Sequence, residues 1–148
     1  MTKIPHLSNL SPSNLDSLNK MSENTLGEAL GIKITVMEEG YVEGTLPVDH
    51  RTHQPYGRLH GGATAALIET LGSVGSHFLA APQKKAAVGV EINVNHLRGK
   101  KSGVVTGKSK LIHQGGRIHV WNTDVEDEDG KLVATGRLTV MIIPNANA

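Results

Sequence analysis

The 148 residues, of which 38% are hydrophobic and 20% charged, fit one soluble globular domain with a single core. The formal net charge of +1 gives no electrostatic reason to expect nucleic acid or an anionic membrane as partner, and an aromatic content of 3% disfavours a base-stacking surface. The absence of cysteine excludes disulfides, thiolate metal sites and a cysteine nucleophile, and it fits a cytoplasmic location. Residues 1–20 contain no continuous apolar core, so we expect no signal peptide there.

The first 30 residues are expected to form a polar leader with short helices. One helix, capped by Ser13 or Asn14, is predicted to end at Lys20, and another is predicted over 23–30. No function is assigned to this leader.

A hairpin and a long loop are predicted to follow the leader. Apolar residues alternate with polar ones over 32–36 and 42–46, and Glu39-Gly40 makes a turn between them. The segment 49–59 has no period and is rich in turn formers. A loop of this length in a compact domain is more often functional than idle.

A long helix is predicted over 61–80, where helix formers follow one another up to Pro82. At about 1.5 Å per residue it would be roughly 30 Å long. The segment is long enough to span a membrane, but Glu69, His77 and several glycines are a poor composition for lipid. A helix that is apolar nearly all round needs cover on more than one side.

Four long strands are predicted after this helix, over about 86–97, 103–113, 117–125 and 131–143. Their connections are short enough for antiparallel hairpins, so we expect the four to form a meander. The order of two strands, one helix and four strands is of the α+β class. It predicts a hotdog fold over 31–143, in which a curved antiparallel sheet of about six strands wraps the central helix, with a tail at 144–148.

Glu69 is the only formal charge between Arg58 and Lys84, and it lies among apolar helix residues. Burying an unpaired carboxylate is costly, so Glu69 should be hydrogen-bonded, paired or facing a cavity. A helix-surface residue or a polar group at a subunit interface is an equally good reading of this residue alone. Ser73, one turn further, could share its side of the helix, although by itself it reads as a small packing residue.

The sequence His60-Gly61-Gly62 opens the helix. Free N–H groups at a helix N-terminus favour negative charge, as an oxyanion hole requires, and glycine lets a carbonyl approach closely. An ordinary glycine-rich helix start is the common alternative. Gln54 could donate an amide hydrogen to the same oxygen, although a loop glutamine is usually just solvated.

These residues form the pattern Q-P-x-G-x-x-H-G-G, with Glu69 nine residues after His60. Residues 44–76, which carry it, resemble the acyl-CoA thioesterases of the hydroxybenzoyl-CoA and phenylacetate-degradation branch of the hotdog superfamily, in particular the dihydroxynaphthoyl-CoA thioesterases. The later segments GVEINVNHLR and HQGGRIHVW are similar to the same subgroup. The resemblance covers nearly the whole domain.

The resemblance implies a role for each residue of the pattern. Glu69 would be the base or nucleophile that acts on the thioester, and the Gly61 N–H and Gln54 would polarise the thioester carbonyl. His60 would position neighbouring groups or the substrate, and Ser73 would hold the water or Glu69. Six further residues match positions that bind substrate or coenzyme A: Gly62, His96, Arg98, Gly115, Gly116 and Arg117. For these, solvated hairpin ends are a strong alternative.

The resemblance also implies a homodimer or homotetramer in which Glu69 of one chain faces the loop and helix start of another. We therefore predict hydrolysis of acyl-CoA thioesters, with aromatic acyl groups preferred and both nucleophilic and general-base mechanisms open. This chemistry needs no metal and no cofactor besides the coenzyme A of the substrate, and the histidines show no spacing typical of a metal site.

Two alternatives are a hotdog hydratase or dehydratase and a non-catalytic acyl-CoA-binding protein. The first would need a catalytic histidine, for which His60 is the candidate. The second would normally carry a DNA-binding segment, which the charge balance does not suggest.

Overall fold

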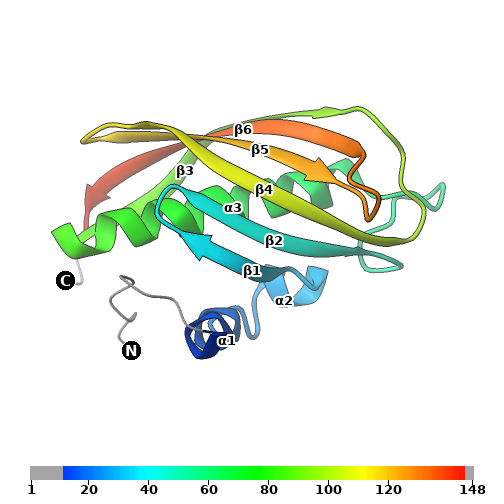
Figure 1. Ribbon diagram of the computed structural model, residues 1–148, viewed down its shortest axis with the longest axis horizontal. Helices are drawn as coiled ribbons and strands as arrows, with labels where there is room; N and C mark the ends of the chain where they lie inside the picture. Colours follow the sequence, from blue (N-terminus) through cyan, green and yellow to red (C-terminus); the bar gives the residue numbers. More distant parts are fainter. Residues whose placement is uncertain (1–11, 146–148) are drawn as a thin grey trace.

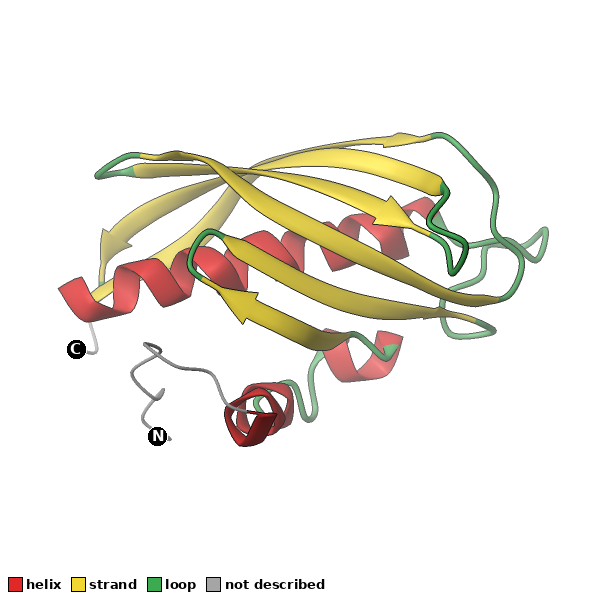
Figure 2. Cartoon of the chain, viewed as in Figure 1, coloured by secondary structure: helices red, strands yellow, loops and turns green. Residues whose placement is uncertain are grey.

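A long helix lies against one antiparallel sheet in the computed structural model, which describes residues 12–145 (Figure 1). The polar stretch 1–11 of the leader and residues 146–148 of the tail lie outside the described residues. The elements are α1 (Pro12–Lys20), α2 (Leu26–Leu30), β1 (Lys33–Glu38), β2 (Tyr41–Val48), α3 (Gly61–Ala80), η1 (Ala81–Gln83), β3 (Lys85–His96), β4 (Gly103–Gln114), β5 (Ile118–Glu126) and β6 (Leu132–Pro144). This confirms the predicted hotdog arrangement of a central helix and six strands (Figure 2).

The sheet has the strand order β1-β2-β4-β5-β6-β3, and every neighbouring pair is antiparallel. The predicted meander of four strands is therefore wrong at its first link. β3 pairs with β6 and forms an edge of the sheet, while β4 pairs with β2 and β5.

The reason lies in the segment between β3 and β4. The N–H groups of Leu97 and Arg98 donate to the Val133 carbonyl, and the Lys100 carbonyl accepts from the Leu59 N–H. These bonds lead the chain across the open end of the curved sheet at the start of α3. β3 and β4 consequently cover different sides of the helix.

Glycines let α3 approach the sheet closely. A Cβ at Gly75 would lie 2.5 Å from the ring of Trp121, and one at Gly72 would lie 2.6 Å from Leu138. Trp121 is fully buried, and its Nε1–H donates to the Ser76 hydroxyl at 2.7 Å. The single tryptophan thus fills the space under the helix in a core otherwise built from aliphatic side chains.

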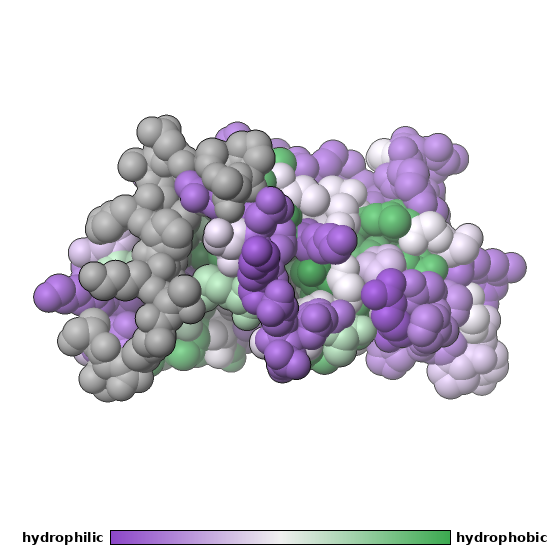
Figure 3. Space-filling view, turned by 90° about the horizontal axis from the view of Figure 1, so that it is seen from below, coloured by the Kyte–Doolittle hydropathy of each residue, from purple (hydrophilic) through white to green (hydrophobic). Residues whose placement is uncertain are grey.

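The helix is not covered all round, in contrast to the expectation of a buried helix. Glu69, Thr70 and Ser73 are only half-buried, and seen from below the molecule shows hydrophobic residues lying open between hydrophilic ones (Figure 3). Among the described residues, no helix is both long and apolar enough to cross a membrane.

The leader protects one edge of the sheet. Asn19 of α1 accepts from the Ile34 N–H at 2.8 Å and donates to the Ile34 carbonyl at 2.9 Å, which occupies backbone groups of edge strand β1. The second predicted helix is shorter than expected, because Asn24 has φ 60° and Thr25 is extended, so α2 begins only at Leu26. The edge formed by β3 carries no such cover among the described residues.

Candidate active site

The loop between β2 and α3 is held in a defined shape. The Thr52 hydroxyl is buried and donates to the Pro47 carbonyl at 2.6 Å, and the His60 N–H donates to the Thr52 carbonyl at 2.8 Å. The Gln54 N–H donates to the Arg58 carbonyl at 2.8 Å, which closes the tip of the loop. Gln54 is thereby fixed beside the start of α3.

His60 caps α3 with its own ring. Its Nδ1 accepts a hydrogen bond from the Gly62 N–H at 2.8 Å, so this nitrogen carries no proton and the Gly62 N–H is occupied. Within residues 12–145 the Gly61 N–H has no hydrogen-bond partner. A Cβ at Gly61 would lie 2.8 Å from Nε2 of His96, so the end of β3 packs directly on the first turn. Gly61 is left as the donor that the sequence predicted for an oxyanion hole.

The side chain of Gln54 also carries a donor, and Gln54 lines the same pocket as Gly61. Its Oε1 accepts from the Tyr56 N–H. Because an N–H can be met only by the oxygen of the amide, the NH₂ group is the free end. One pocket of about 310 Å³ lies at the start of α3 and brings together four of the predicted site residues: Gln54, Gly61, His96 and Arg98. The rest of its lining consists of Arg58, Leu59, Thr64, Leu97, Gly99 and Val133.

The mouth of this pocket is positively charged. Arg58, which the sequence analysis did not single out, lies against Gly99, where a Cβ would come within 2.9 Å of its Cδ. Arg98 is half-exposed, and its Nη1 lies 4.0 Å from Oδ2 of Asp127. Two guanidinium groups at one mouth suit an anionic group such as phosphate. The only sequence signal for Arg58 was its place in the turn before His60.

A carboxylate fixes the segment that carries Arg98. Glu128, in the turn between β5 and β6, accepts hydrogen bonds from the Lys100 ammonium and from the Val104 N–H, the latter at 2.7 Å. These donors lower the pKa of Glu128 to about 2. The segment between β3 and β4 is thus tied to the turn between β5 and β6.

Glu69 lies at the middle of α3, on the side that faces β3. The Ser73 hydroxyl donates to Oε1 of Glu69 at 3.2 Å, and the carboxylate rests on Gly89, where a Cβ would come within 2.0 Å of the same oxygen. Gly89 was missed in the sequence, although a lone glycine inside an alternating strand is a known sign of close approach. Only glycine at this position leaves room for the carboxylate.

One chain does not bring all the predicted site residues together. Glu69 is eight residues from Gly61 on one helix, about 12 Å along its axis, and neither Glu69 nor Ser73 lines the pocket at the helix start. Gly115 and Gly116 line a second pocket beside Ala80, at the other end of α3 from His96 and Arg98. The exposed Arg117 adjoins these glycines. The roles carried over from the resemblance stay predictions.

Within residues 12–145 no three His, Asp or Glu side chains are grouped as ligands of a metal ion would be. The described groups offer instead a carboxylate, a free helix N-terminal N–H and a primary amide. Thioester hydrolysis can be assembled from these three, because it requires a carbonyl polariser and a base or nucleophile.

Comparison with known proteins agrees with this chemistry. The sequence model of the thioesterase superfamily matches residues 56–134 of this chain. The chain is 41% identical over 129 residues to 1,4-dihydroxy-2-naphthoyl-CoA hydrolase of Escherichia coli, covering 87% of this chain and 94% of that protein. It is 44% identical over 129 residues to the proofreading thioesterase EntH of Klebsiella pneumoniae, covering 87% and 93%. A solved thioesterase of Haemophilus influenzae superimposes with a TM-score of 0.86 at 40% identity, covering 93% of this chain and 94% of that one.

Proposed function

The chain belongs to the thioesterase superfamily and hydrolyses acyl-CoA thioesters, and from that premise we propose that the preferred acyl groups are aromatic and that Glu69 is the catalytic carboxylate. The observation that carries the role of Glu69 is its position: Ser73 donates to it and Gly89 makes room for it. The aromatic preference is supported by the naphthoyl substrate in the name of the Escherichia coli relative. The cytoplasmic location is part of the same proposal.

We propose further that each active site is shared between two copies of the chain, in a homodimer or a homotetramer. A reacting carbonyl must lie about 3 Å from both the oxyanion donor and the attacking group. The roughly 12 Å between Gly61 and Glu69 along one helix forbids this within a chain. A second copy can supply the missing half, and the edge strand β3, with Val88 42% and Val90 49% exposed, is available for pairing.

In this arrangement the thioester oxygen accepts hydrogen bonds from the Gly61 N–H and the Gln54 amide of one copy. Glu69 of the other copy either takes a proton from water, whose oxygen adds to the carbonyl carbon, or attacks that carbon itself. On either route, collapse of the tetrahedral intermediate breaks the C–S bond and releases the thiolate of coenzyme A. Attack by water gives the free acid directly, whereas attack by Glu69 leaves a mixed anhydride that a water molecule then hydrolyses to the free acid and the Glu69 carboxylate. Arg58 and Arg98 hold phosphates of the nucleotide at the pocket mouth.

The first test is Glu69→Gln, assayed by release of free thiol from a panel of aromatic and aliphatic acyl-CoA substrates. Loss of the charge should lower turnover about 10²- to 10⁴-fold, the usual contribution of a general base, while the far-ultraviolet circular dichroism stays unchanged. Glu91→Gln is the matched control, because Glu91 is exposed on β3 and contacts Asn93. Turnover of Glu69→Gln within a few-fold of the parent would remove Glu69 from the mechanism, and faster hydrolysis of the aliphatic thioesters would remove the aromatic preference.

The shared site is tested by mixing two inactive variants, Glu69→Gln and Gln54→Ala. After subunit exchange, demonstrated by native mass spectrometry, heterodimers contain one intact site and one doubly damaged site. Activity should return to about one quarter of the parent level, because half of the dimers are mixed and each holds one good site of two. Exchange without any return of activity would place both halves of the site in a single chain.

A further inference from the structure

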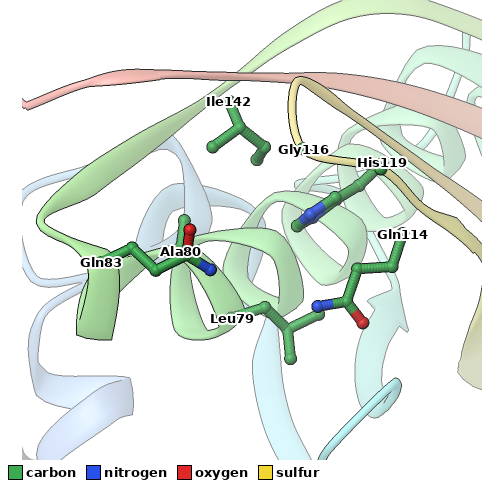
Figure 4. Close-up of a pocket in the computed structure, with 8 residues that line it drawn as sticks. Leu79, Ala80, Gln83, Gln114, Gly116, His119 and Ile142 are labelled. Carbon is green, nitrogen blue, oxygen red and sulfur yellow. The ribbon is translucent and has the colours of Figure 1, made fainter.

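His53 lies in the loop between β2 and α3, directly before Gln54. It does not line the pocket at the start of α3, and the histidine that borders the pocket at the other end of the helix is His119 (Figure 4). Because His53 lines neither pocket, any effect that it has on the reaction passes through the residues that it contacts.

The imidazole ring of His53 joins two segments that are distant in the sequence. Its Nε2 lies 2.8 Å from the carbonyl oxygen of Lys101, in the segment between β3 and β4. A carbonyl oxygen only accepts, so Nε2 carries a proton and donates; the neutral Nε2–H tautomer and the imidazolium both meet this requirement. Lys101 follows Arg98 by three residues, so the bond connects the loop of Gln54 to the segment of Arg98.

The pocket at the start of α3 has two halves. The first half is the β2–α3 loop with the start of α3, which carries Gln54 and Gly61, and the second half is the β3–β4 segment, which carries Arg98. Hydrogen bonds within the loop and to β2 hold the first half. The second half is attached to Val133 of β6 and to Glu128 in the turn before it. Gln54 and Arg98 are thus fixed to different parts of the fold.

Among the described residues, two hydrogen bonds join these halves. The Leu59 N–H donates to the Lys100 carbonyl at 2.7 Å, and the His53 ring donates to the next carbonyl along the chain. One bond alone would leave the two halves free to pivot about it, whereas two bonds at neighbouring carbonyls restrict that rotation. Arg58 also contacts Gly99, but through the methylene part of a flexible side chain, which does not fix a spacing.

We propose that His53 is a positioning residue that sets the distance between the amide donor of Gln54 and the phosphate-binding guanidinium of Arg98. The inference rests on the function proposed above for these two residues. An acyl-CoA reaches both halves of the pocket at once, because the pantetheine arm joins the thioester to the nucleotide phosphates. The spacing of the halves therefore matters for acyl-CoA, and it does not matter for a thioester without the nucleotide.

His53→Phe in the full-length protein tests this link, because phenylalanine keeps an aromatic ring and removes the donor. Thiol release is measured with an aromatic acyl-CoA and with the N-acetylcysteamine thioester of the same acid, which lacks the nucleotide. We expect kcat/KM to fall about tenfold for the acyl-CoA, the upper range for one hydrogen bond, and to stay within about twofold for the short thioester. The Tm should change little, because the bond is exposed to solvent.

Matched variants separate the hydrogen bond from the ring. His53→Gln offers an amide N–H to the same carbonyl and should recover about half or more of the parent activity on acyl-CoA. His50→Phe makes the same substitution at a nearby side chain that is 90% exposed, and it should leave the rates on both substrates unchanged. In an Arg98→Ala background, His53→Phe should cost little more on acyl-CoA, because the two changes act through one contact.

Each outcome bears on a different step. Long-range ¹H–¹⁵N spectra of the parent should show a proton on Nε2 of His53, and a proton on Nδ1 alone would refute the hydrogen bond itself. Equal losses on the two substrates, or full additivity with Arg98→Ala, would show that His53 supports the loop and not the spacing. Loss with Arg98→Ala but none with His53→Phe would overturn the inference and leave the proposed function standing. No loss with Arg98→Ala alone would refute the proposed phosphate contact, and the inference with it.

Discussion

Gly89→Ala separates the position of the proposed catalytic carboxylate, Glu69, from the stability of the fold. The added Cβ would stand 2.0 Å from Oε1 of Glu69, so the carboxylate must retreat by about 1.4 Å to reach ordinary contact at 3.4 Å. A misplacement of about 1 Å in a catalytic group can cost on the order of 100-fold in rate. We therefore expect kcat to fall by about 100-fold or more.

Stability should move in the opposite direction. The atom in the way is the end of a flexible side chain, which can rotate off the strand at little cost. Alanine also loses less conformational freedom than glycine on folding, which favours it inside a strand by roughly 0.5–1 kcal/mol. The Tm should stay constant or rise by up to about 3 °C for a chain of this size.

The assay pairs thiol release from an aromatic acyl-CoA with thermal unfolding of the same samples. Gly27→Ala is the control, because a Cβ there meets nothing closer than 3.5 Å and Gly27 lies in α2. Added to Glu69→Gln, the Gly89→Ala change should cost nothing further, since the two act through one group. Activity within a few-fold of the parent, or losses of activity and Tm that run in parallel, would refute the reasoning.

Three further changes test other parts of the molecule. Arg98→Ala should raise KM for acyl-CoA about tenfold with kcat nearly unchanged, and should spare a thioester without the nucleotide; equal losses on both substrates would contradict phosphate contact. The pKa of Glu128 is lowered to about 2, so its ion pair with Lys100 stabilises the fold above about pH 4.5 and is lost as the pH falls toward 2. Glu128→Gln should therefore lower the Tm at pH 7 and make the Tm fall less steeply as the pH is lowered. An unchanged dependence of the Tm on pH would show that the pair does not contribute to stability. Gly75→Ala should destabilise the protein by about 1–3 kcal/mol in urea unfolding, because the ring of Trp121, 2.5 Å from the new Cβ, has no room to retreat; wild-type stability would mean that the core adapts.

The sequence predicts where the long helix and the last four strands lie, but it does not predict which strands pair in the sheet. The helix over 61–80 was predicted at the bounds that the structure shows, and the last four strands within about two residues, because composition and alternation act locally. Alternation says which face a residue takes but not which strand lies beside it. The pairing of β3 with β6 depends on the hydrogen bonds of the segment after His96, which no local pattern encodes.

The same division applies to the site. The contact of Ser73 with Glu69 follows from helical spacing and was anticipated. The contact of the Glu69 carboxylate with Gly89 was not anticipated, because it depends on the register of a strand twenty residues further along the chain. Arg58 was missed for a similar reason, since its place at the pocket mouth is set by Gly99 of another loop.

The geometry of α3 gives the proposed dimer its form. Two copies of a helix related by a two-fold axis perpendicular to it run antiparallel, so Glu69 of one copy lies level with Gly61 of the other when such an axis passes beside Ala65, midway between them. Side chains on the uncovered side of α3, such as those of Thr70 and Ser73, are small, which permits close approach of the helices. An axis of this kind also sets the two β3 edges antiparallel, as continuation of the sheet requires. One two-fold-related copy could therefore both pair with the open edge strand β3 and supply the missing half of the proposed active site.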